Sequence, residues 1–165
     1  MSDSTERRDP ARISGLEYLR GIGNGEFPKP PMMVTLGIEG VVINEGRAVF
    51  RVAPDERHLN TMGIAHGGLA STLCDTALGC AVHSLLAPGV GYTTLELKVN
   101  FVRAMTRGMG SVECEAKVVH LGSRVATAEA RVTDGAGKLY AHATTTCLIL
   151  GGAAAPALRT DPAAG

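Results

Sequence analysis

The chain has few of the features that would assign it to a class at once. Its 165 residues include sixteen basic and sixteen acidic side chains, so the formal net charge is zero. Nucleic-acid-binding proteins usually carry a basic excess, and its absence argues against a nucleic-acid partner. The four cysteines form no CxxC pair, and no charged-then-apolar leader opens the chain. We therefore expect reduced thiols and a cytoplasmic location.

A long uninterrupted apolar run is also missing. Residues 69–87 come closest, but Ser, Thr, Asp and His side chains interrupt them. A lipid-exposed helix tolerates such groups poorly, so this run predicts a core helix and no membrane partner. The length and the 45% apolar composition suit one domain with a sizeable core.

Composition divides the chain into three regions. Residues 1–30 are predicted to form an N-terminal arm with a short helix around residues 14–22, which must end before the PKPP stretch. Residues 31–150 are predicted to form the main domain. Residues 151–165, rich in Ala, Gly and Pro, are predicted to be a flexible tail.

The main domain is predicted to be of the α+β class. Two short strands, at residues 41–43 and 48–53, flank an Asn-Glu-Gly turn, and one long helix and four alternating strands follow. In the strand from residue 93, Leu95, Leu97 and the next odd-numbered residues should share one face, and the even-numbered residues from Thr94 the other. An open antiparallel sheet can bury a single apolar helix only by curling around it.

The start of the long helix offers backbone donors. Gly67 and Gly68 stand where a loop enters the helix, so their N–H groups have no intrahelical acceptor. The positive end of the helix dipole and the absence of side chains suit a ligand that develops negative charge. The alternative is that the Gly-Gly pair is only a junction between loop and helix.

Asp75 is the one carboxylate of this helix, which is otherwise apolar nearly all round. Burying a charged carboxylate is costly, so either Ser71, Thr72 and Thr76 satisfy it or it takes part in chemistry. Gly67 precedes Asp75 by eight residues, about 12 Å along a helix axis, so one chain cannot easily bring both to one atom. If both act on one substrate, a second helix must run antiparallel alongside, in a dimer with two equivalent sites.

Three stretches carry a family resemblance: HLNTMGIAHGGLASTLCDTALGCAVHSLL, GYTTLELKVNFVRAMTRG and VVHLGSRVATAEARVTDGAGKLYAHATTT. With Asn60, His66-Gly67-Gly68 and Asp75 in this order, residues 31–150 resemble the PaaI-like branch of the hotdog-fold acyl-CoA thioesterases, in the 4-hydroxybenzoyl-CoA thioesterase-like superfamily. The resemblance implies a single hotdog domain that hydrolyses an acyl-CoA to a free acid and CoA, without a separate cofactor. It also implies a homodimer with shared active sites and favours a homotetramer.

The resemblance implies catalytic roles for four residues. Asp75 would take the place of the helix carboxylate that activates water or attacks the thioester directly. Gly67 would supply the backbone N–H that polarises the thioester carbonyl, as oxyanion donors do. Asn60 would orient the water or the leaving sulfur, and His66 would hold the loop and help to position the carbonyl.

Further residues are implied to bind the substrate. Thr93 or Thr94 falls where relatives place a hydroxyl that holds the attacking water, and the register leaves both open. The turn at residues 122–124 matches the family's site for the CoA phosphates, and turn N–H groups beside a basic side chain suit that task. Arg107 is a further phosphate candidate. The predicted substrate-binding residues are Gly68, Thr93, Thr94, Arg103, Gly122, Ser123 and Arg124.

Other chemistries fit the sequence less well. The remaining histidines are scattered, so no metal site is predicted. Cys74 lacks an activating base and is interpreted as a core residue. Hydratases and dehydratases of acyl thioesters share the fold and pair a loop histidine with a helix carboxylate, but the spacing from His66 to Asp75 favours hydrolysis. A non-catalytic acyl-CoA-binding module is the third alternative, and it would not need a costly helix carboxylate. Small, medium and aryl acyl groups all remain open as substrates.

Overall fold

A computed structural model of the protein describes residues 8–151. The predicted tail therefore lies, apart from Gly151, outside the described residues. No helix in this part of the chain is long and apolar enough to span a bilayer. The elements in chain order are η1 (Pro10–Arg12), α1 (Gly15–Gly23), α2 (Pro31–Leu36), β1 (Glu39–Asn44), β2 (Arg47–Val52), η2 (Glu56–His58), α3 (Gly67–His83), β3 (Gly91–Phe101), β4 (Val112–Leu121), β5 (Val125–Asp134) and β6 (Leu139–Leu150).

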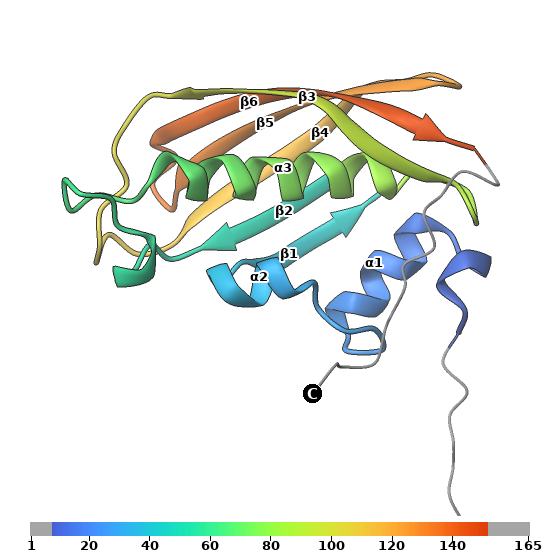
Figure 1. Ribbon diagram of the computed structural model, residues 1–165, viewed down its shortest axis with the longest axis horizontal. Helices are drawn as coiled ribbons and strands as arrows, with labels where there is room; N and C mark the ends of the chain where they lie inside the picture. The colour runs from blue at the N-terminus through green and yellow to red at the C-terminus, as the bar shows by residue number, and fades with distance from the viewer. Residues whose placement is uncertain (1–7, 152–165) are drawn as a thin grey trace, which may run out of the picture.

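The six strands form one antiparallel sheet in the order β1-β2-β4-β5-β6-β3. The sheet curls around α3, which lies along its concave face and contacts every strand (Figure 1). This arrangement confirms the predicted α+β class and the single long central helix. Both edge strands, β1 and β3, lie beside the helix, so each edge can contribute to a site on α3.

The core forms where α3 meets the sheet. Leu73 and Leu78 on the helix are fully buried, and each such side chain stabilises the fold by about 1.5–3 kcal/mol. Opposite them, β4 and β5 carry mostly alanine on their inner face. Small side chains there let the strands approach the helix closely. The buried alanines of these two strands are Ala116, Ala126, Ala128 and Ala130.

Helix α1 packs against the C-terminal end of α3. Its N-terminus is closed by a capping box between Ser14 and Glu17, which satisfies two backbone donors. The ring of Tyr18 lies between the rings of Phe27 and His83, with centroids 5.0 and 5.9 Å away. This end of α3 is therefore covered by the arm.

Helix α2 was not predicted from the sequence, because the PKPP stretch was interpreted as a break. The last of its prolines, Pro31, is instead the first residue of α2, where its missing N–H has no helical acceptor to lose. The helix ends at Gly37, whose φ of 64° is the left-handed conformation that glycine adopts without strain. The prolines therefore begin a helix here.

Strand β3 departs from the predicted alternation at one residue. Thr94 pairs with Cys147 and Glu96 with Thr146, so Leu95 is an extra residue in a β-bulge. The bulge turns Leu95 outward, with 60% of its surface exposed, whereas Leu97 packs on the core as predicted. The prediction that Thr94 lies on the opposite face from Leu97 is wrong, because the bulge shifts the alternation by one and brings both to the helix side.

Candidate active site

Asp75 lies on a strip of α3 that faces away from the sheet. Its residue is exposed, although Cys74 beside it is fully buried. The interpretation of α3 as a helix buried nearly all round, with Asp75 at a buried position, is therefore wrong. The sheet wraps only part of the helix circumference, and the uncovered strip consists of small or polar residues. The strip, which we call the open strip, contains Gly68, Thr72, Asp75 and Thr76.

The carboxylate of Asp75 has a partner from the sheet. The hydroxyl of Thr94 donates a hydrogen bond of 3.1 Å to Asp75 Oδ1. Two of the three neighbouring hydroxyls considered from the sequence bond elsewhere: Ser71 donates to the carbonyl of Gly67 and Thr72 to that of Gly68. Hydroxyls in helices commonly bond the carbonyl four residues earlier. The bulge in β3 thus provides the hydrogen bond that the helix does not.

The two candidate threonines occupy different positions. Thr94 points to α3, whereas Thr93 is exposed and adjacent to it in the strand, where successive side chains alternate between faces. Of the two, the structure brings only Thr94 to the carboxylate.

His66 and the two glycines form the N-terminal end of α3. His66 is the N-cap residue, and its Nδ1 accepts a hydrogen bond of 2.9 Å from the N–H of Gly68. This bond places the ring proton on Nε2. The N–H of Gly67 has no acceptor among the described residues. Gly67 therefore offers a backbone donor, whereas the donor of Gly68 is engaged.

The side chain of Asn60 holds the loop before α3. Its Oδ1 accepts hydrogen bonds from the N–H groups of Met62, at 2.9 Å, and Ile64, at 3.4 Å. Its backbone also pairs with Ile64 across the same turn. With the oxygen engaged, the amide nitrogen is the part of Asn60 that can donate to a ligand.

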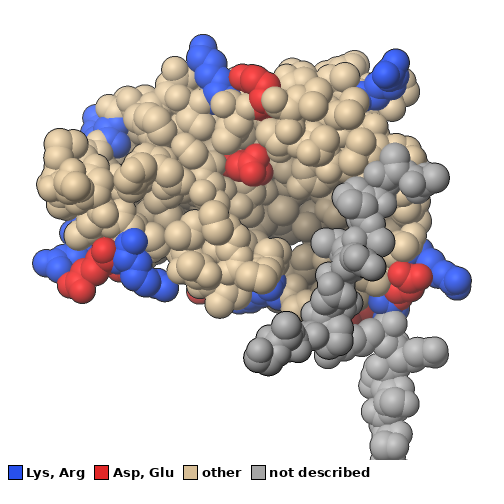
Figure 2. Space-filling model, viewed as in Figure 1, with Lys and Arg blue, Asp and Glu red and all other residues tan. Residues whose placement is uncertain are grey.

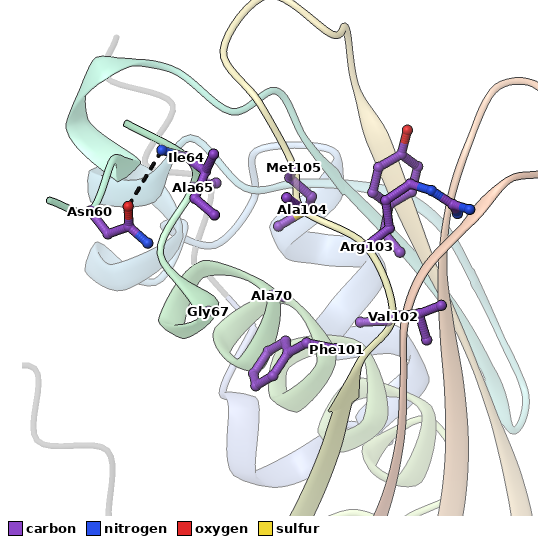
Figure 3. A pocket seen from close by; sticks show the side chains of 12 residues that line it. Asn60, Ile64, Ala65, Gly67, Ala70, Phe101, Val102, Arg103, Ala104 and Met105 are labelled. Carbon is purple, nitrogen blue, oxygen red and sulfur yellow. Dashed lines mark hydrogen bonds between the residues drawn. The ribbon is translucent and has the colours of Figure 1, made fainter. Parts of the chain in front are cut away.

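A cavity of about 340 Å³ opens beside the start of α3 (Figure 3). Its lining includes Asn60, Gly67 and the end of β3 at Phe101. The Phe101 ring lies 3.1 Å from the position that a side-chain carbon on residue 67 would occupy. A side chain at residue 67 would therefore require the exposed Phe101 ring to shift by a few tenths of an ångström, and the cavity places the Gly67 backbone beside an apolar wall.

The predicted phosphate-binding residues lie at two opposite ends of the molecule. The turn at residues 122–124 joins β4 to β5 at the end of the sheet where α3 finishes (Figure 1). Arg103 lies at the other end, where its Nη1 donates to the carbonyl of Leu139 at 2.6 Å and its guanidinium lies over the Tyr140 ring. Arg107 forms an ion pair of 2.6 Å with Glu56. The structure does not bring these basic groups together within one chain.

Tyr92 extends the site along the helix and was not singled out in the sequence. Its ring lies over Gly79, one helical turn after Asp75, at distances that leave no room for a side chain on residue 79. Burial, with Cys80, Cys147 and Asp75 adding to it, raises the pKa of the Tyr92 hydroxyl. Burial, with the charge of Asp75, also raises the pKa of Cys80 to about 12, so this thiol is neutral near pH 7. The sequence carries no signal for Tyr92, because its position over Gly79 depends on how β3 packs against α3.

A model of the thioesterase superfamily matches residues 62–141, which contain α3, the bulge in β3 and the Thr94–Asp75 hydrogen bond. Several curated relatives carry the name Putative esterase, and two of them are described here. The one from Pseudomonas aeruginosa is 40% identical over 49% of this chain and 60% of its own length. The one from Saccharolobus solfataricus is 32% identical over 66% of this chain and 75% of its own length. The chain belongs to the thioesterase superfamily.

A further relative of this thioesterase is the 1,4-dihydroxy-2-naphthoyl-CoA hydrolase of Listeria monocytogenes, 28% identical over 64% of this chain and 84% of the relative. The predicted enzyme class, a thioester hydrolase, is confirmed by these relatives.

Solved structures agree on the fold. A phenylacetic acid degradation-related protein of Ralstonia eutropha is 26% identical, with a TM-score of 0.73 over 79% of this chain and 98% of that chain. The PaaI protein of Escherichia coli is 23% identical, with a TM-score of 0.72 over 85% of this chain and 97% of that chain. A Streptococcus mutans protein bound to acetyl-CoA is 26% identical, with a TM-score of 0.64 over 70% of this chain and 90% of that chain. The predicted resemblance to the PaaI-like hotdog thioesterases is confirmed.

Proposed function

We propose that this thioesterase hydrolyses an acyl-CoA, with a small, medium or aryl acyl group, to the free acid and CoA at a site built from Asp75 and Gly67. The observation that supports this most directly is an exposed carboxylate held by the Thr94 hydroxyl on the open strip of α3. The acyl-CoA substrate is suggested by the name of the Listeria relative and by the acetyl-CoA in the Streptococcus structure.

The chemistry follows from these groups. The thioester carbonyl would accept a hydrogen bond from the Gly67 N–H, which stabilises the oxyanion by about 10²- to 10³-fold in rate. Asp75 would take a proton from water as the water oxygen attacks the carbonyl carbon, a contribution of about 10²- to 10⁴-fold. The carbon–sulfur bond then breaks, and the proton passes to the leaving thiolate. In the alternative, Asp75 attacks the carbonyl carbon itself and water hydrolyses the resulting anhydride.

The supporting residues would position these groups. Thr94 would orient the carboxylate through its hydrogen bond, and the amide nitrogen of Asn60 would hold the water or the leaving sulfur. His66 would fix the loop through its cap on Gly68. The turn at residues 122–124 would bind the CoA phosphates, with Arg103 as a further contact.

We infer a homodimer in which each site combines Asp75 of one subunit with Gly67 of the other. The two residues are about 12 Å apart along one helix, too far to act on one carbonyl. The face that carries α3 has few charges across its middle, with most charged side chains near its margins (Figure 2). Beside it, edge strand β3 exposes Leu95 and Phe101, and Val102, directly after the strand, is exposed as well. An antiparallel second helix would also bring the phosphate turn, at the far end of α3, toward the Gly67 end of the other subunit.

We extend this proposal to a homotetramer of two such dimers, which the family resemblance favours. The cytoplasmic location is proposed with it, since Cys74, Cys80, Cys114 and Cys147 are all unpaired thiols.

Complementation between two inactive variants tests the shared site. Gly67→Pro removes the proposed oxyanion donor at a helix position where proline is tolerated, and His66 before it already has the extended backbone that proline requires. Asp75→Asn removes the carboxylate. Expressed alone, each should have little thioesterase activity. Co-expressed at equal levels, they should regain about a quarter of wild-type activity, because half of the dimers are mixed and each has one intact site.

Gly67→Ala is the matched control, because it keeps the N–H and adds only the carbon that approaches Phe101. Activity of Gly67→Ala well above that of Gly67→Pro would assign the loss to the donor. If the co-expressed pair stays at background, Asp75 and Gly67 do not combine across subunits and the shared-site proposal fails. Release of thiol from a saturated acyl-CoA, but no hydration of an enoyl-CoA, would separate hydrolysis from the hydratase alternative.

A further inference from the structure

A second cavity lies on the opposite side of α3 from the Thr94–Asp75 hydrogen bond. It has a volume of about 450 Å³, within the range of about 300–1,000 Å³ typical of small-molecule sites. Its walls come from α1, α2, the edge strand β1, β2 and α3. The lining is mainly apolar and includes Leu19, Ile22, Met33, Val42, Ile43 and Phe50.

Two cations line this apolar space. Arg20 donates hydrogen bonds to two neutral oxygens, the carbonyl of Ile43 and the side-chain oxygen of Asn44. Lys29 forms no ion pair among the described residues. The one carboxylate of the lining, Glu39, is paired with Arg51 at 3.0 Å. The cavity therefore combines apolar walls with two positive charges that lack a negative partner in the described chain.

The cavity reaches the helix that carries Asp75. Cys80 of α3 lines it and follows Asp75 by five residues, about 7.5 Å along the axis. Cys80 is small and its thiol is neutral, so it adds no charge that would oppose an anion in the cavity. Thr76 of the open strip lies between Asp75 and Cys80 in the helix, one turn before Cys80.

We propose that this cavity binds an apolar chain that ends in a carboxylate, with the chain against Ile22, Val42 and Phe50 and the carboxylate between Arg20 and Lys29. Arg20 and Lys29 are exposed to solvent, so an apolar ligand without a negative charge would leave their charges to water alone. A polar anion without a chain would leave the apolar walls facing water. A carboxylate at the end of a hydrocarbon chain satisfies both.

This ligand chemistry has two sources. One is a free carboxylic acid, the product class of thioester hydrolysis. The other is the distal end of an acyl group still attached to CoA, which would cross α3 from Asp75 toward Cys80. The second source rests on the proposed function, and the first does not.

Calorimetric titration of the full chain at neutral pH tests the first source. Decanoate is expected to bind about three- to tenfold more tightly than 1-decanol, the scale of two partly exposed ion pairs. Arg20→Gln combined with Lys29→Gln should remove that difference. Arg131→Gln combined with Lys138→Gln removes two cations from outside the cavity and should leave it unchanged. Ile22→Trp, which fills the apolar part, should weaken both ligands.

Kinetics test the second source. We compare decanoyl-CoA with sebacoyl-CoA, the same chain with a terminal carboxylate. If the acyl group enters the cavity, the double variant should lower kcat/KM for sebacoyl-CoA by about three- to tenfold and leave decanoyl-CoA nearly unchanged. If the double variant loses the preference for decanoate over 1-decanol but keeps its kcat/KM for sebacoyl-CoA, the cavity binds a free acid.

The proposal is overturned if decanoate and 1-decanol bind equally tightly and the double variant leaves kcat/KM unchanged for both sebacoyl-CoA and decanoyl-CoA. Failure of the proposed function is distinguishable from this outcome. A protein that hydrolyses no acyl-CoA at all would still show, in the decanoate titration, whether the cavity binds a carboxylate.

Discussion

The two faces of α3 obey different constraints. The face toward the sheet consists of Leu, Ala and Cys side chains that are almost entirely buried, and its contacts hold the six strands in place. On the open strip, Asp75 accepts a hydrogen bond from Thr94 of β3, and one turn later the ring of Tyr92 covers the buried Gly79. Substitutions on the first face should therefore change stability and leave the chemistry intact. Substitutions on the strip should do the reverse.

The largest expected effect on the open strip comes from Asp75→Asn. The amide has the same shape but cannot take a proton from water, so kcat/KM for an acyl-CoA should fall by about 10²- to 10⁴-fold. Thiol release measures the rate, and thermal unfolding should change little because the residue is exposed. Turnover within about threefold of wild type would contradict the assignment of Asp75.

On the buried face, Leu73→Ala is the matching change. The side chain is fully buried, so its removal should lower the free energy of unfolding by about 2–5 kcal/mol. Chemical denaturation measures the loss. Activity per folded molecule should stay near wild type at a temperature where the variant is folded. A variant that is stable but inactive would show that the two faces are not separable.

Thr94→Val tests the contact between strip and sheet. It keeps the shape of the side chain and removes the donor to Asp75, so kcat should fall by about tenfold with little change in KM. Thr93→Val, on the exposed face of the same strand, is the control and should leave both kcat and KM unchanged.

The smallest expected effect concerns the end of α3 that α1 covers. Burial lowers the pKa of His83 below its usual 6.5, so the unfolded chain binds a proton at a higher pH than the folded chain does. Stability should then be fully present above about pH 6.5 and fall as the pH drops through the window below it. His83→Gln should flatten this part of the stability profile, measured by denaturation at several pH values. An unchanged slope would show that His83 does not cause it.

Much of the fold could be predicted because its signals are local. The start of the helix at Gly67 and the antiparallel strands follow from turn residues and periodicity, whereas the helix ends at His83, before the apolar run over residues 69–87 does. The exposure of Asp75 could not be predicted, because Ala, Gly and Thr look alike in sequence whether they pack against a sheet or lie uncovered. That distinction depends on how far the sheet curls, which is a tertiary property.

The position of Thr94 was missed for a different reason. Residues 95–101 alternate without interruption, so nothing in the strand itself indicates an extra residue. The bulge allows Tyr92 to lie over Gly79 while Leu97 packs on the core, and both contacts are made with elements outside the strand. The cavity under the arm was equally inaccessible, since it forms between elements that are distant in the chain.

The extra residue in β3 also determines which length changes this strand can accept. Without Leu95, regular pairing could return in only two ways. Either Tyr92 and Thr94 would rotate away from α3, or Leu97 and Val99 would rotate out of the core. A single-residue deletion at this point would therefore force the protein to keep either its carboxylate contact or its packing. Insertions and deletions should be excluded from the middle of β3 even where substitutions are accepted.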